Sequence, residues 1–335
     1  MSASMGRQGA RPRVGFLGMG WIGRNRMEAL VRSEQVQVVG LCDPSAAAVR
    51  EARSLAPNAE CVASLDALLD LGLDGLVIAT PGAVHSEQSL RALARGVSVF
   101  CQKPLGRTAA EVQRVVDAAR AADRLLGLDL SYRFTAGMRQ LRERIQAGAL
   151  GDIYAVNLVF HNAYGPDKPW FHDPKLAGGG CVMDLGIHLV DLALWVLGFP
   201  KVETVTSQRF SQGRPLASRE QGVEDFAAAQ LQLGTGTAVQ LACSWKLPAG
   251  CDAVIEAAFY GTQGGAAFRN VDGSFYDFTA DAFQGTRRER LSEPPDAWGG
   301  RAAVAWATRL GRGERFDAET ERLVDVAATL DRLCA

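Results

Sequence analysis

A short apolar run that ends in three spaced glycines constrains this chain more than any other feature. Residues 14–17 precede Gly18-Met-Gly20-Trp21-Ile22-Gly23, and apolar residues at helical spacing follow as far as Arg32. In such a strand–turn–helix unit the first glycine permits a tight turn, the second lets a phosphate approach the backbone, and the third lets helix and strand pack closely. The unpaired N–H groups of the first helical turn can then bind the phosphates. The pattern therefore predicts a dinucleotide at Gly18, Gly20, Trp21, Ile22 and Gly23, with an ordinary glycine-rich turn as the alternative.

An acidic residue follows at the distance that such a unit requires. A second apolar run, residues 36–42, ends at Asp43, which lies 20 residues after Gly23. Its carboxylate can accept hydrogen bonds from ribose hydroxyls, whereas a 2′-phosphate would meet a like charge. The next residue, Pro44, offers no compensating cation, although two arginines of the following helix could reach the position. NAD is expected rather than NADP; an aspartate that only caps a helix is the alternative.

Strand and helix patterns alternate through residues 1–131. Apolar runs typical of buried strands recur at 75–79, 97–101 and 125–130, and helical patterns at about 85–95 and 108–122 lie between them. Strands that alternate with helices imply a parallel sheet covered on both faces. The sequence therefore predicts an NAD-binding α/β Rossmann domain over residues 1–131.

The character of the chain changes after about Ser131. A helical pattern near 137–147 precedes long strand-like segments, and residues such as Leu233-Gly-Thr-Gly236 are typical of hairpin turns. The strand-like segments are 153–161, 202–210, 226–233, 238–245 and 253–260, interrupted by a helical block at 183–197. We expect an α+β domain with an open, mostly antiparallel sheet over residues 132–316, and a C-terminal helix within 317–335. Residues 269–312 carry no clear pattern.

Composition excludes several classes of protein. Thirty-six basic and 37 acidic side chains give a net charge of −1, so nothing attracts the chain strongly to nucleic acid or to an anionic membrane. The seven cysteines include no Cys-x-x-Cys pair and the four histidines no His-x-x-x-His pair. Neither a disulfide framework nor a metal site is therefore expected. The longest apolar stretch, 182–199, contains two aspartates and a histidine, which makes it a poor membrane span. We expect a cytoplasmic protein that acts on a small molecule.

A lysine–proline step follows the strand predicted at 97–101. Gln102-Lys103-Pro104 begins where that strand ends, and ligand crevices in open α/β sheets lie outside the carboxyl ends of the strands. Lys103 is therefore expected near the cofactor, with a solvated surface lysine as the alternative. Only five of the 36 basic residues are lysine, so few cationic side chains in this protein can release a proton.

A second group of polar residues lies in the helical block at 183–197. Asp184 and His188 are four residues apart and follow three glycines, Gly178 to Gly180. On a helix the two side chains share one face. A carboxylate and an imidazole among apolar residues need a partner or a function. The alternative is a capping aspartate and a hydrogen-bonded core histidine.

Together these motifs carry a family resemblance. The glycine motif, Asp43, Thr80-Pro81 with His85, Lys103-Pro104 and Asp184-x-Gly-x-His188 occur in the order of the glucose–fructose oxidoreductase and inositol dehydrogenase (Gfo/Idh/MocA) family. The chain resembles that family over nearly its whole length. The resemblance implies that the last helix packs on the Rossmann domain and that a homodimer or homotetramer forms through the exposed sheet. It also implies hydride transfer between a nicotinamide and a secondary alcohol or ketone of a sugar, cyclitol or glycoside.

The resemblance also assigns catalytic roles to three residues. Lys103 would hydrogen-bond the reacting oxygen, His188 would exchange its proton, and Asp184 would orient the imidazole or bind a substrate hydroxyl. An imidazole suits proton exchange near neutral pH, and an ammonium stabilises a developing alkoxide in a dry cleft. Which of Lys103 and His188 is the formal base stays open, because their titrations would be coupled.

The same comparison predicts further cofactor contacts, from Thr80, Pro81, His85, Gln102 and Lys103. Gln102 departs from the family pattern, which usually has glutamate at this position. Its amide can still hydrogen-bond a ribose hydroxyl, but it brings no negative charge beside the lysine.

Substrate contacts are predicted from position and side-chain type alone. Arg133 lies where the chain crosses into the second domain, Asn157 and His161 lie on one strand, and Trp170 lies in the loop before the glycines. Aromatic faces and short polar groups suit a polyol ring, although each of these residues could equally serve packing. The predicted substrate-binding set is Lys103, Arg133, Asn157, His161, Trp170, Asp184 and His188.

Two rival functions stay open beside an NAD-dependent dehydrogenase or reductase. One is a redox-neutral glycosidase that holds NAD and oxidises its substrate only transiently. The other is a non-enzymatic regulator that responds to a dinucleotide. The joint presence of Lys103, Asp184 and His188 favours an enzyme, because a sensor would not need all three.

Overall fold

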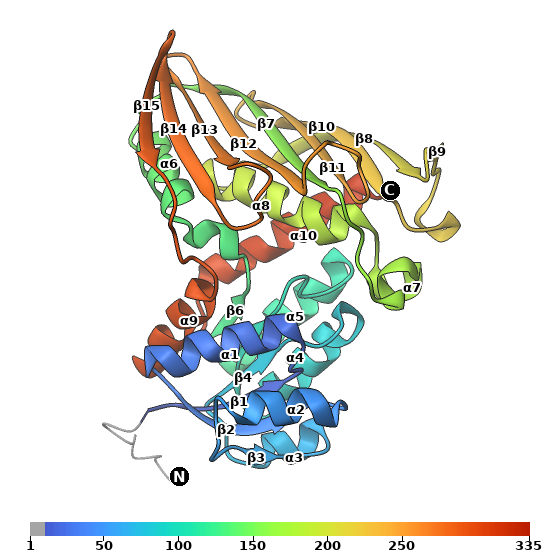
Figure 1. The fold of residues 1–335 in the computed structure, drawn as a ribbon, viewed down its shortest axis with the longest axis vertical. Helices are drawn as coiled ribbons and strands as arrows, with labels where there is room; N and C mark the ends of the chain where they lie inside the picture. The colour runs from blue at the N-terminus through green and yellow to red at the C-terminus, as the bar shows by residue number, and fades with distance from the viewer. Residues whose placement is uncertain (1–10) are drawn as a thin grey trace.

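The computed structural model describes residues 11–335 and consists of two sheets with helices packed between them (Figure 1). One sheet is parallel and is covered by helices on both faces; the other is mostly antiparallel and is covered on one face. The predicted fold class is therefore confirmed. Residues 1–10, which the prediction included in the first domain, lie outside the described residues.

The first half of the chain forms a six-stranded parallel sheet. Its strands are β1 (Arg13–Leu17), β2 (Gln37–Cys42), β3 (Glu60–Cys61), β4 (Gly75–Ile78), β5 (Ser98–Cys101) and β6 (Leu126–Leu128). Its helices are α1 (Trp21–Ser33), α2 (Ala46–Arg53), α3 (Leu65–Leu69), the short η1 (Gly82–Val84), α4 (His85–Ala94) and α5 (Ala109–Ala122). The strand order is β3-β2-β1-β4-β5-β6. The order reverses between β1 and β4, and in such sheets ligands bind in the crevice at that point.

Side chains cap three of these helices, whereas α1, η1 and α4 have no side-chain cap. Ser45, Ser64 and Thr108 cap α2, α3 and α5, each accepting a hydrogen bond from a backbone N–H three residues further on. Such a cap stabilises a helix by roughly 1 kcal/mol. Helix α1 begins at Gly20 with no side-chain cap, so its first-turn N–H groups remain available to a ligand.

The second half forms a nine-stranded sheet. Its strands are β7 (Ile153–Asn162), β8 (Val202–Ser211), β9 (Arg214–Pro215), β10 (Phe226–Leu233), β11 (Ala238–Ser244), β12 (Ala253–Gly261), β13 (Gly265–Asn270), β14 (Phe278–Gln284) and β15 (Arg287–Ser292). The order is β15-β14-β13-β12-β7-β11-β10-β8-β9, and β7 and β11 form its parallel pair. Most of the patternless stretch 269–312 thus completes one edge of this sheet.

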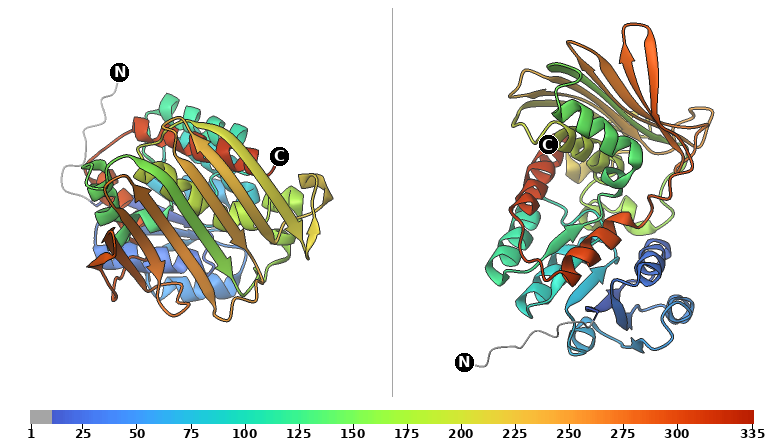
Figure 2. Two further views of the ribbon diagram at one scale, coloured as in Figure 1. Left: turned by 90° about the horizontal axis from the view of Figure 1, so that it is seen from above. Right: turned by 90° about the vertical axis from the view of Figure 1, so that its left-hand side faces the viewer.

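Side chains alternate between the two faces of the second sheet. Val156, Leu158 and Phe160 of β7 are buried against helices, so the residues between them point to the opposite face. Seen from above, that opposite face carries no helix of residues 11–335 (Figure 2, left). We call it the open face.

The remaining helices connect and cover the two sheets. They are η2 (Ser131–Phe134), α6 (Ala136–Gln146), η3 (Pro169–His172), α7 (Pro174–Ala177), the π-helical turn η4 (Val182–Gly186), α8 (Ile187–Val196), η5 (Arg219–Gln221), α9 (Arg301–Gly311), η6 (Ala318–Glu321) and α10 (Arg322–Leu333). The stretch Pro174–Val196 has the length and hydropathy of a membrane span, but 83% of its most apolar window is buried inside the fold. Burial on all sides is typical of a core helix.

The chain returns to the nucleotide domain earlier than predicted. Helix α9, which lies inside the range predicted for the second domain, packs against α1 and the first sheet (Figure 1). The Trp306 ring lies over Gly75 and Gly127, where a Cβ would collide with it, and its centroid is 5.7 Å from that of Phe100. Helix α10 then lies between α5 and α8 and so contacts both domains. Helix α9 thus packs on the nucleotide domain although it lies within the predicted range 132–316, and the domain boundaries themselves stay a prediction.

Candidate active site

The glycine turn forms a cradle at the carboxyl end of β1. Gly18 has a left-handed φ of 91°, and a Cβ there would lie 2.6 Å from the Ala79 backbone. A Cβ on Gly23 would lie 2.3 Å from the carbonyl oxygen of Gly18, whereas a Cβ on Gly20 would meet nothing within 4 Å. Packing thus requires the two outer glycines, while the middle one opens the start of α1 to a ligand. This geometry fits a pyrophosphate bound by backbone N–H groups.

The Asp43 side chain, directly after β2, accepts a hydrogen bond from the backbone of the glycine turn. Its Oδ2 accepts a hydrogen bond from the Met19 N–H (2.6 Å) and its Oδ1 accepts one from the Ser45 N–H (2.8 Å). Each carboxylate oxygen has a second acceptor position. Asp43 can therefore orient the turn and still accept hydrogen bonds from a ribose.

Four further predicted cofactor residues border the cradle. Trp21 and Ile22 begin α1, and the Trp21 side chain is 63% exposed. Thr80 and Pro81 follow β4, next to the Ala79 backbone that contacts Gly18. Both pairs lie where the sequence predicted them, and their contact with a cofactor stays a prediction.

His85 does not face the cradle. It is 1% exposed, and its two ring nitrogens lie 2.7 Å from the carbonyl oxygens of Thr80 and Pro104. Burial holds the pKa of His85 below its usual value, against the opposing effect of these two contacts. The ring links the loop after β4 to the Lys103–Pro104 turn, and a contact of His85 with a cofactor stays a prediction.

An ion pair between Lys103 and Asp184 joins the two domains at the candidate site. Lys103 Nζ donates to Asp184 Oδ1 (2.6 Å) and to the Asp184 carbonyl oxygen (2.8 Å). The two side chains are 18% and 20% exposed, so the pair is largely desolvated. An ammonium group has three N–H donors, so these two bonds leave one donor of Lys103 for a ligand.

Asp184 has a second partner that the sequence analysis did not single out. Its Oδ2 accepts a hydrogen bond from Trp245 Nε1 (3.0 Å), and Trp245 is 4% exposed. Trp245 directly follows β11 and lies 61 residues from Asp184 along the chain. No local sequence motif therefore indicates the hydrogen bond between them. Lys103 and Trp245 together fix both carboxylate oxygens.

Glu224 anchors the turn that carries Asp184. Its Oε1 accepts hydrogen bonds from the N–H groups of Gly180 (2.7 Å) and Val182 (3.1 Å), and its carbonyl oxygen accepts one from Cys181 (3.0 Å). A Cβ on Gly180 would lie 1.9 Å from that carbonyl oxygen, so only glycine permits this approach. Burial raises the pKa of Glu224, against the opposing effect of its hydrogen bonds. Gly180 therefore serves backbone packing against a buried glutamate.

His188 lies near Lys103 but forms no hydrogen bond with Asp184 in residues 11–335. The turn η4 is π-helical, with the Ile187 N–H bonded to the Val182 carbonyl oxygen, and this wider turn changes the angle between residues four apart. The prediction that Asp184 orients the imidazole is therefore corrected; the carboxylate is held by Lys103 and Trp245 instead.

Apolar rings surround the imidazole. The ring centroid of Tyr132 lies 4.9 Å from that of His188, edge to face, and that of Phe160 lies 6.4 Å away. Although His188 keeps partial solvent access, burial holds its pKa well below the usual value, and the charges of Lys103 and Arg26 lower it further. His188 is therefore a neutral imidazole at pH 7.

Tyr132, and not Arg133, is the residue of this turn that lies beside His188. Tyr132 packs on His188, and burial raises the pKa of its hydroxyl, which stays protonated. Arg133 turns the other way: its Nε donates to Asp191 Oδ2 (2.8 Å), its Nη2 donates to Asp191 Oδ1, and its guanidinium lies over the Trp195 ring. The geometry gives Arg133 a structural ion pair in place of the predicted substrate contact.

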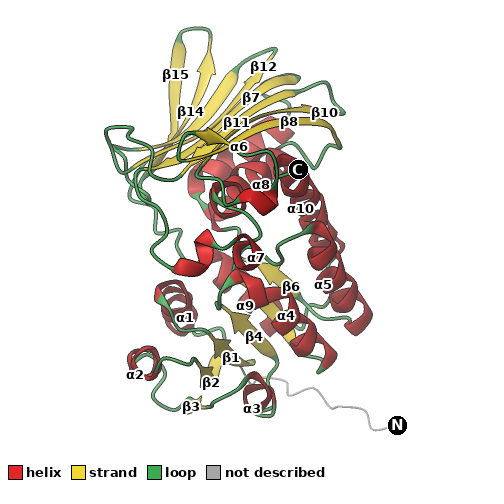
Figure 3. Ribbon diagram, turned by 90° about the vertical axis from the view of Figure 1, so that its right-hand side faces the viewer, coloured by secondary structure: helices red, strands yellow, loops and turns green. Residues whose placement is uncertain are grey.

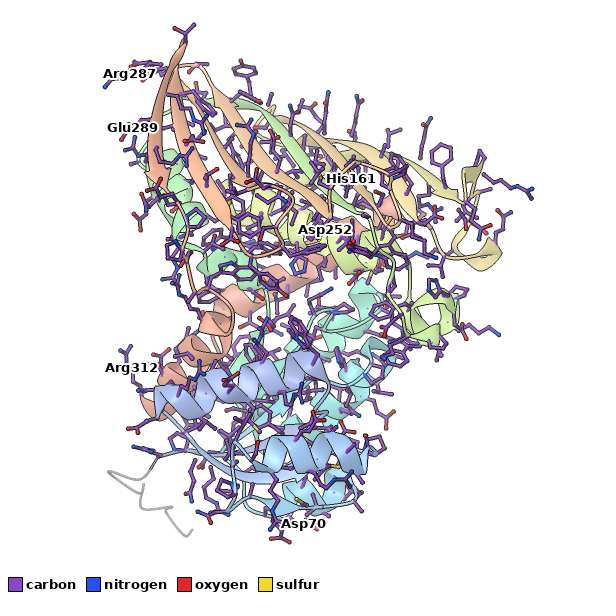
Figure 4. All side chains as sticks on the ribbon, viewed as in Figure 1. Asp70, His161, Asp252, Arg287, Glu289 and Arg312 are labelled. Atoms are coloured by element: carbon purple, nitrogen blue, oxygen red, sulfur yellow. The ribbon has the colours of Figure 1, made fainter. Side chains whose placement is uncertain are left out.

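Asn157 and His161 lie on the open face, away from Lys103. Phe160 points toward His188, so its neighbour His161 points to the other side of β7; Figure 4 labels His161 on this sheet. The His161 ring stacks at 6.0 Å on Phe226, and its Nδ1 lies 2.8 Å from the Ser244 hydroxyl oxygen. Their predicted role in the same substrate site is corrected, because the sheet separates them from the cleft.

Trp170 lies in a loop that bridges the two domains. Its ring centroid is 5.9 Å from that of Phe171, which in turn lies 6.2 Å from Trp245. The following helix α7 lies beneath the nine-stranded sheet, beside the nucleotide domain (Figure 3). There Arg107 Nη1 donates to the Lys175 carbonyl oxygen (2.6 Å). Trp170 is thus connected through Phe171 to Trp245, the partner of Asp184, and its contact with a substrate stays a prediction.

The glycine turn after β1 and the Lys103–Asp184 ion pair between the two domains occur in a chain that two family models match. A family model described as the oxidoreductase family with an NAD-binding Rossmann fold matches residues 12–130. The model of the GFO/IDH/MocA C-terminal domain matches residues 138–267. The chain belongs to the GFO/IDH/MocA family, and the resemblance drawn from its motifs is confirmed.

Two curated relatives are about 30% identical to this chain over the residues that align. The D-glucoside 3-dehydrogenase of Escherichia coli (strain K12) is 31% identical over 209 residues, which are 59% of this chain and 60% of that protein. The 1,5-anhydro-D-fructose reductase of Ensifer adhaerens is 30% identical over 77% of this chain and 76% of that protein. The chain thus spans about three fifths of the first relative's length.

Solved structures share the fold at lower identity. The crystal structure of GenD2 from gentamicin A biosynthesis, in complex with NAD, has a TM-score of 0.79 and 23% identity, and the match covers 99% of this chain and 95% of that one. The predicted Rossmann domain followed by an open-sheet domain is therefore a known arrangement.

Replacing Trp245 by phenylalanine tests its hydrogen bond to Asp184. We expect Trp245→Phe to lower the free energy of unfolding by about 1.5–3 kcal/mol more than Trp306→Phe does, the usual contribution of a hydrogen bond to a charged group. Trp306 is the matched control because it is equally buried, at 4% exposure, and its Nε1 has no hydrogen-bond partner. Urea unfolding of both variants gives the comparison; equal losses would show that the Trp245 bond contributes nothing.

Proposed function

We propose that this protein is an NAD-dependent oxidoreductase that moves a hydride between nicotinamide and a CH–OH carbon of a sugar, cyclitol or glycoside. The observation that carries the proposal is the uncommitted N–H donor of Lys103 beside the neutral imidazole of His188. The names of the relatives, a glucoside dehydrogenase and an anhydrofructose reductase, support a carbohydrate substrate. We further propose a cytoplasmic location.

The cradle residues would hold the cofactor. Backbone N–H groups from Gly20 to Gly23 would bind the pyrophosphate, and Asp43 would accept hydrogen bonds from the adenosine ribose. A 2′-phosphate there would meet the Asp43 carboxylate, so NAD is favoured over NADP. When bound, NAD supplies the hydride acceptor for alcohol oxidation.

Lys103 would bind the reacting oxygen. Asp184 accepts hydrogen bonds from two N–H groups of Lys103, so the third can donate to a hydroxyl or carbonyl oxygen of a substrate. This donor lowers the pKa of a bound hydroxyl and stabilises the alkoxide as the C–H bond breaks. Asp184 acts here by holding Lys103, and its contact with substrate stays a prediction.

His188 would accept the hydroxyl proton during oxidation and return it during reduction. A base must be unprotonated before it can act, and the low pKa of His188 keeps the ring neutral at pH 7. The same low pKa makes it a weak base, so proton transfer depends on the acidifying effect of Lys103 on the substrate. The two residues thus work as one unit.

The experiment that tests this function follows absorbance at 340 nm with NAD and a panel of polyols, sugars and glycosides. We expect at least one compound to be oxidised, and we expect Lys103→Met to lower the rate by about 100-fold or more, as loss of a transition-state donor does. NAD affinity should change by less than about threefold, because the cradle supplies the phosphate and ribose contacts. Lys201→Met is the control, since Lys201 is 77% exposed and pairs with Glu203.

The possible results separate the rival functions. A Lys103→Met variant that keeps more than about a tenth of the activity would contradict the role of Lys103. A flat absorbance trace together with cleavage of a glycoside would indicate the redox-neutral enzyme. A flat trace with every compound intact would contradict an enzyme for these substrate classes.

We also propose that the open face joins two copies of this chain. Its centre carries short uncharged side chains, among them Asn157, Val159, Ala228, Ala242 and Ala258, which pair across neighbouring strands. Such a flat surface suits a second sheet of the same kind.

Sedimentation velocity tests this contact. We expect a dimer or tetramer, and Ala242→Arg should reduce it toward one chain by placing a charge in the contact. Ala121→Arg, on the exposed side of α5, is the control. A wild-type protein that sediments as one chain at micromolar concentration would overturn the proposal.

A further inference from the structure

A buried polar network lies behind Lys103, and the proposed mechanism does not use it. Asp129, directly after β6, is 0% exposed, and Arg26, on α1, is 6% exposed. Arg26 Nε donates to Asp129 Oδ2, and the Ser131 hydroxyl donates to Asp129 Oδ1 (2.8 Å). Gln102 Nε2 completes the network by donating to Asp129 Oδ2 (2.8 Å).

Every polar group of this network has a partner. Arg26 also donates to the Ser131 hydroxyl oxygen (3.1 Å) and to Asn25 Oδ1 (2.6 Å). A buried ion pair is tolerated only when hydrogen bonds satisfy both ions, and removing one partner leaves an uncompensated charge. The network therefore holds α1, β5 and β6 in one arrangement.

Gln102 connects this network to the catalytic lysine. Its Nε2 donates to Asp129, and its Oε1 accepts from the backbone N–H of Lys103 (3.0 Å). An ionised carboxylate accepts hydrogen bonds and cannot donate, so Asp129 dictates which way the amide points. The amide oxygen is then turned to the N–H of Lys103.

We propose that Asp129 is a positioning residue for the reaction, acting through Gln102 on the Lys103 turn. This inference rests on the proposed function. The arrangement requires a carboxylate at 129, because Asp129 only accepts hydrogen bonds. It requires an amide at 102, because Gln102 donates to Asp129 and accepts from the Lys103 N–H. With Arg26 as its counter-ion, Asp129 fixes the backbone from which Lys103 reaches Asp184 and the substrate.

The proposal predicts a specific pattern of failure and rescue. Gln102→Glu places two carboxylates in contact, and like charges that close cannot both stay ionised without loss. Asp129→Asn removes the negative charge that pairs with Arg26. In the double variant the amide and the carboxylate have changed places, so the network again carries one negative charge against Arg26.

The test compares the wild type, Gln102→Glu, Asp129→Asn and the double variant by kcat, KM, the pH profile of kcat and the thermal unfolding midpoint. We expect each single change to lower kcat at least about tenfold with KM nearly unchanged, because small misplacements of a catalytic group have large effects. The pH profile of Gln102→Glu should shift, since the added carboxylate titrates. The double variant should recover to within about threefold of the wild-type kcat.

Gln113→Glu with Asp117→Asn is the matched control, because Gln113 Nε2 donates to Asp117 Oδ1 (3.0 Å) in an exposed amide–carboxylate pair of α5. Kinetic effects that simply add in the double variant, or single variants that change only the unfolding midpoint, would overturn the proposal. If the wild type turns over no compound, the proposed function fails instead. The coupling is then measured by NAD affinity and the unfolding midpoint, where rescue supports the Asp129–Gln102 link and additivity overturns it.

Discussion

The ion pair between Lys103 and Asp184 is the contact on which the rest of the site depends. It joins residues 81 positions apart, one at the end of β5 and the other in the π-helical turn η4, and so links the two domains across the cleft. Each partner is itself fixed: Asp184 by Trp245 and by the turn that Glu224 anchors, Lys103 by Gln102. Because both charges are largely desolvated, neither is stable there without the other.

Local sequence patterns predicted most of the fold and the residues at the centre of the site. Strand–helix alternation and the glycine turn depend on neighbours in the sequence, so they predicted the Rossmann domain, Asp43 and the positions of Lys103 and His188. The patternless stretch 269–312 was harder, because its short strands and α9 are defined by what they pack against. Trp306, for example, packs over two glycines, Gly75 and Gly127, that lie far from it in the sequence.

The errors arose where function depends on contacts between distant segments. Period-two spacing put Asn157 and His161 on one face of a strand, but it does not say which face of the sheet meets the cleft. Helical spacing put Asp184 beside His188, and the π-helical turn separated them. Trp245 and Asp129 were missed because hydrogen bonds across 61 and 103 residues leave no local signal.

The central claim is that a neutral imidazole lies beside a charged lysine, and nuclear magnetic resonance of histidine-labelled protein tests it most directly. The chain has four histidines, so His188→Gln assigns the signal of His188. The account predicts that the His188 ring stays neutral at pH 6.5, the ordinary histidine pKa, and becomes protonated only at lower pH. A His188 ring that is half protonated at or above pH 6.5 would contradict the account.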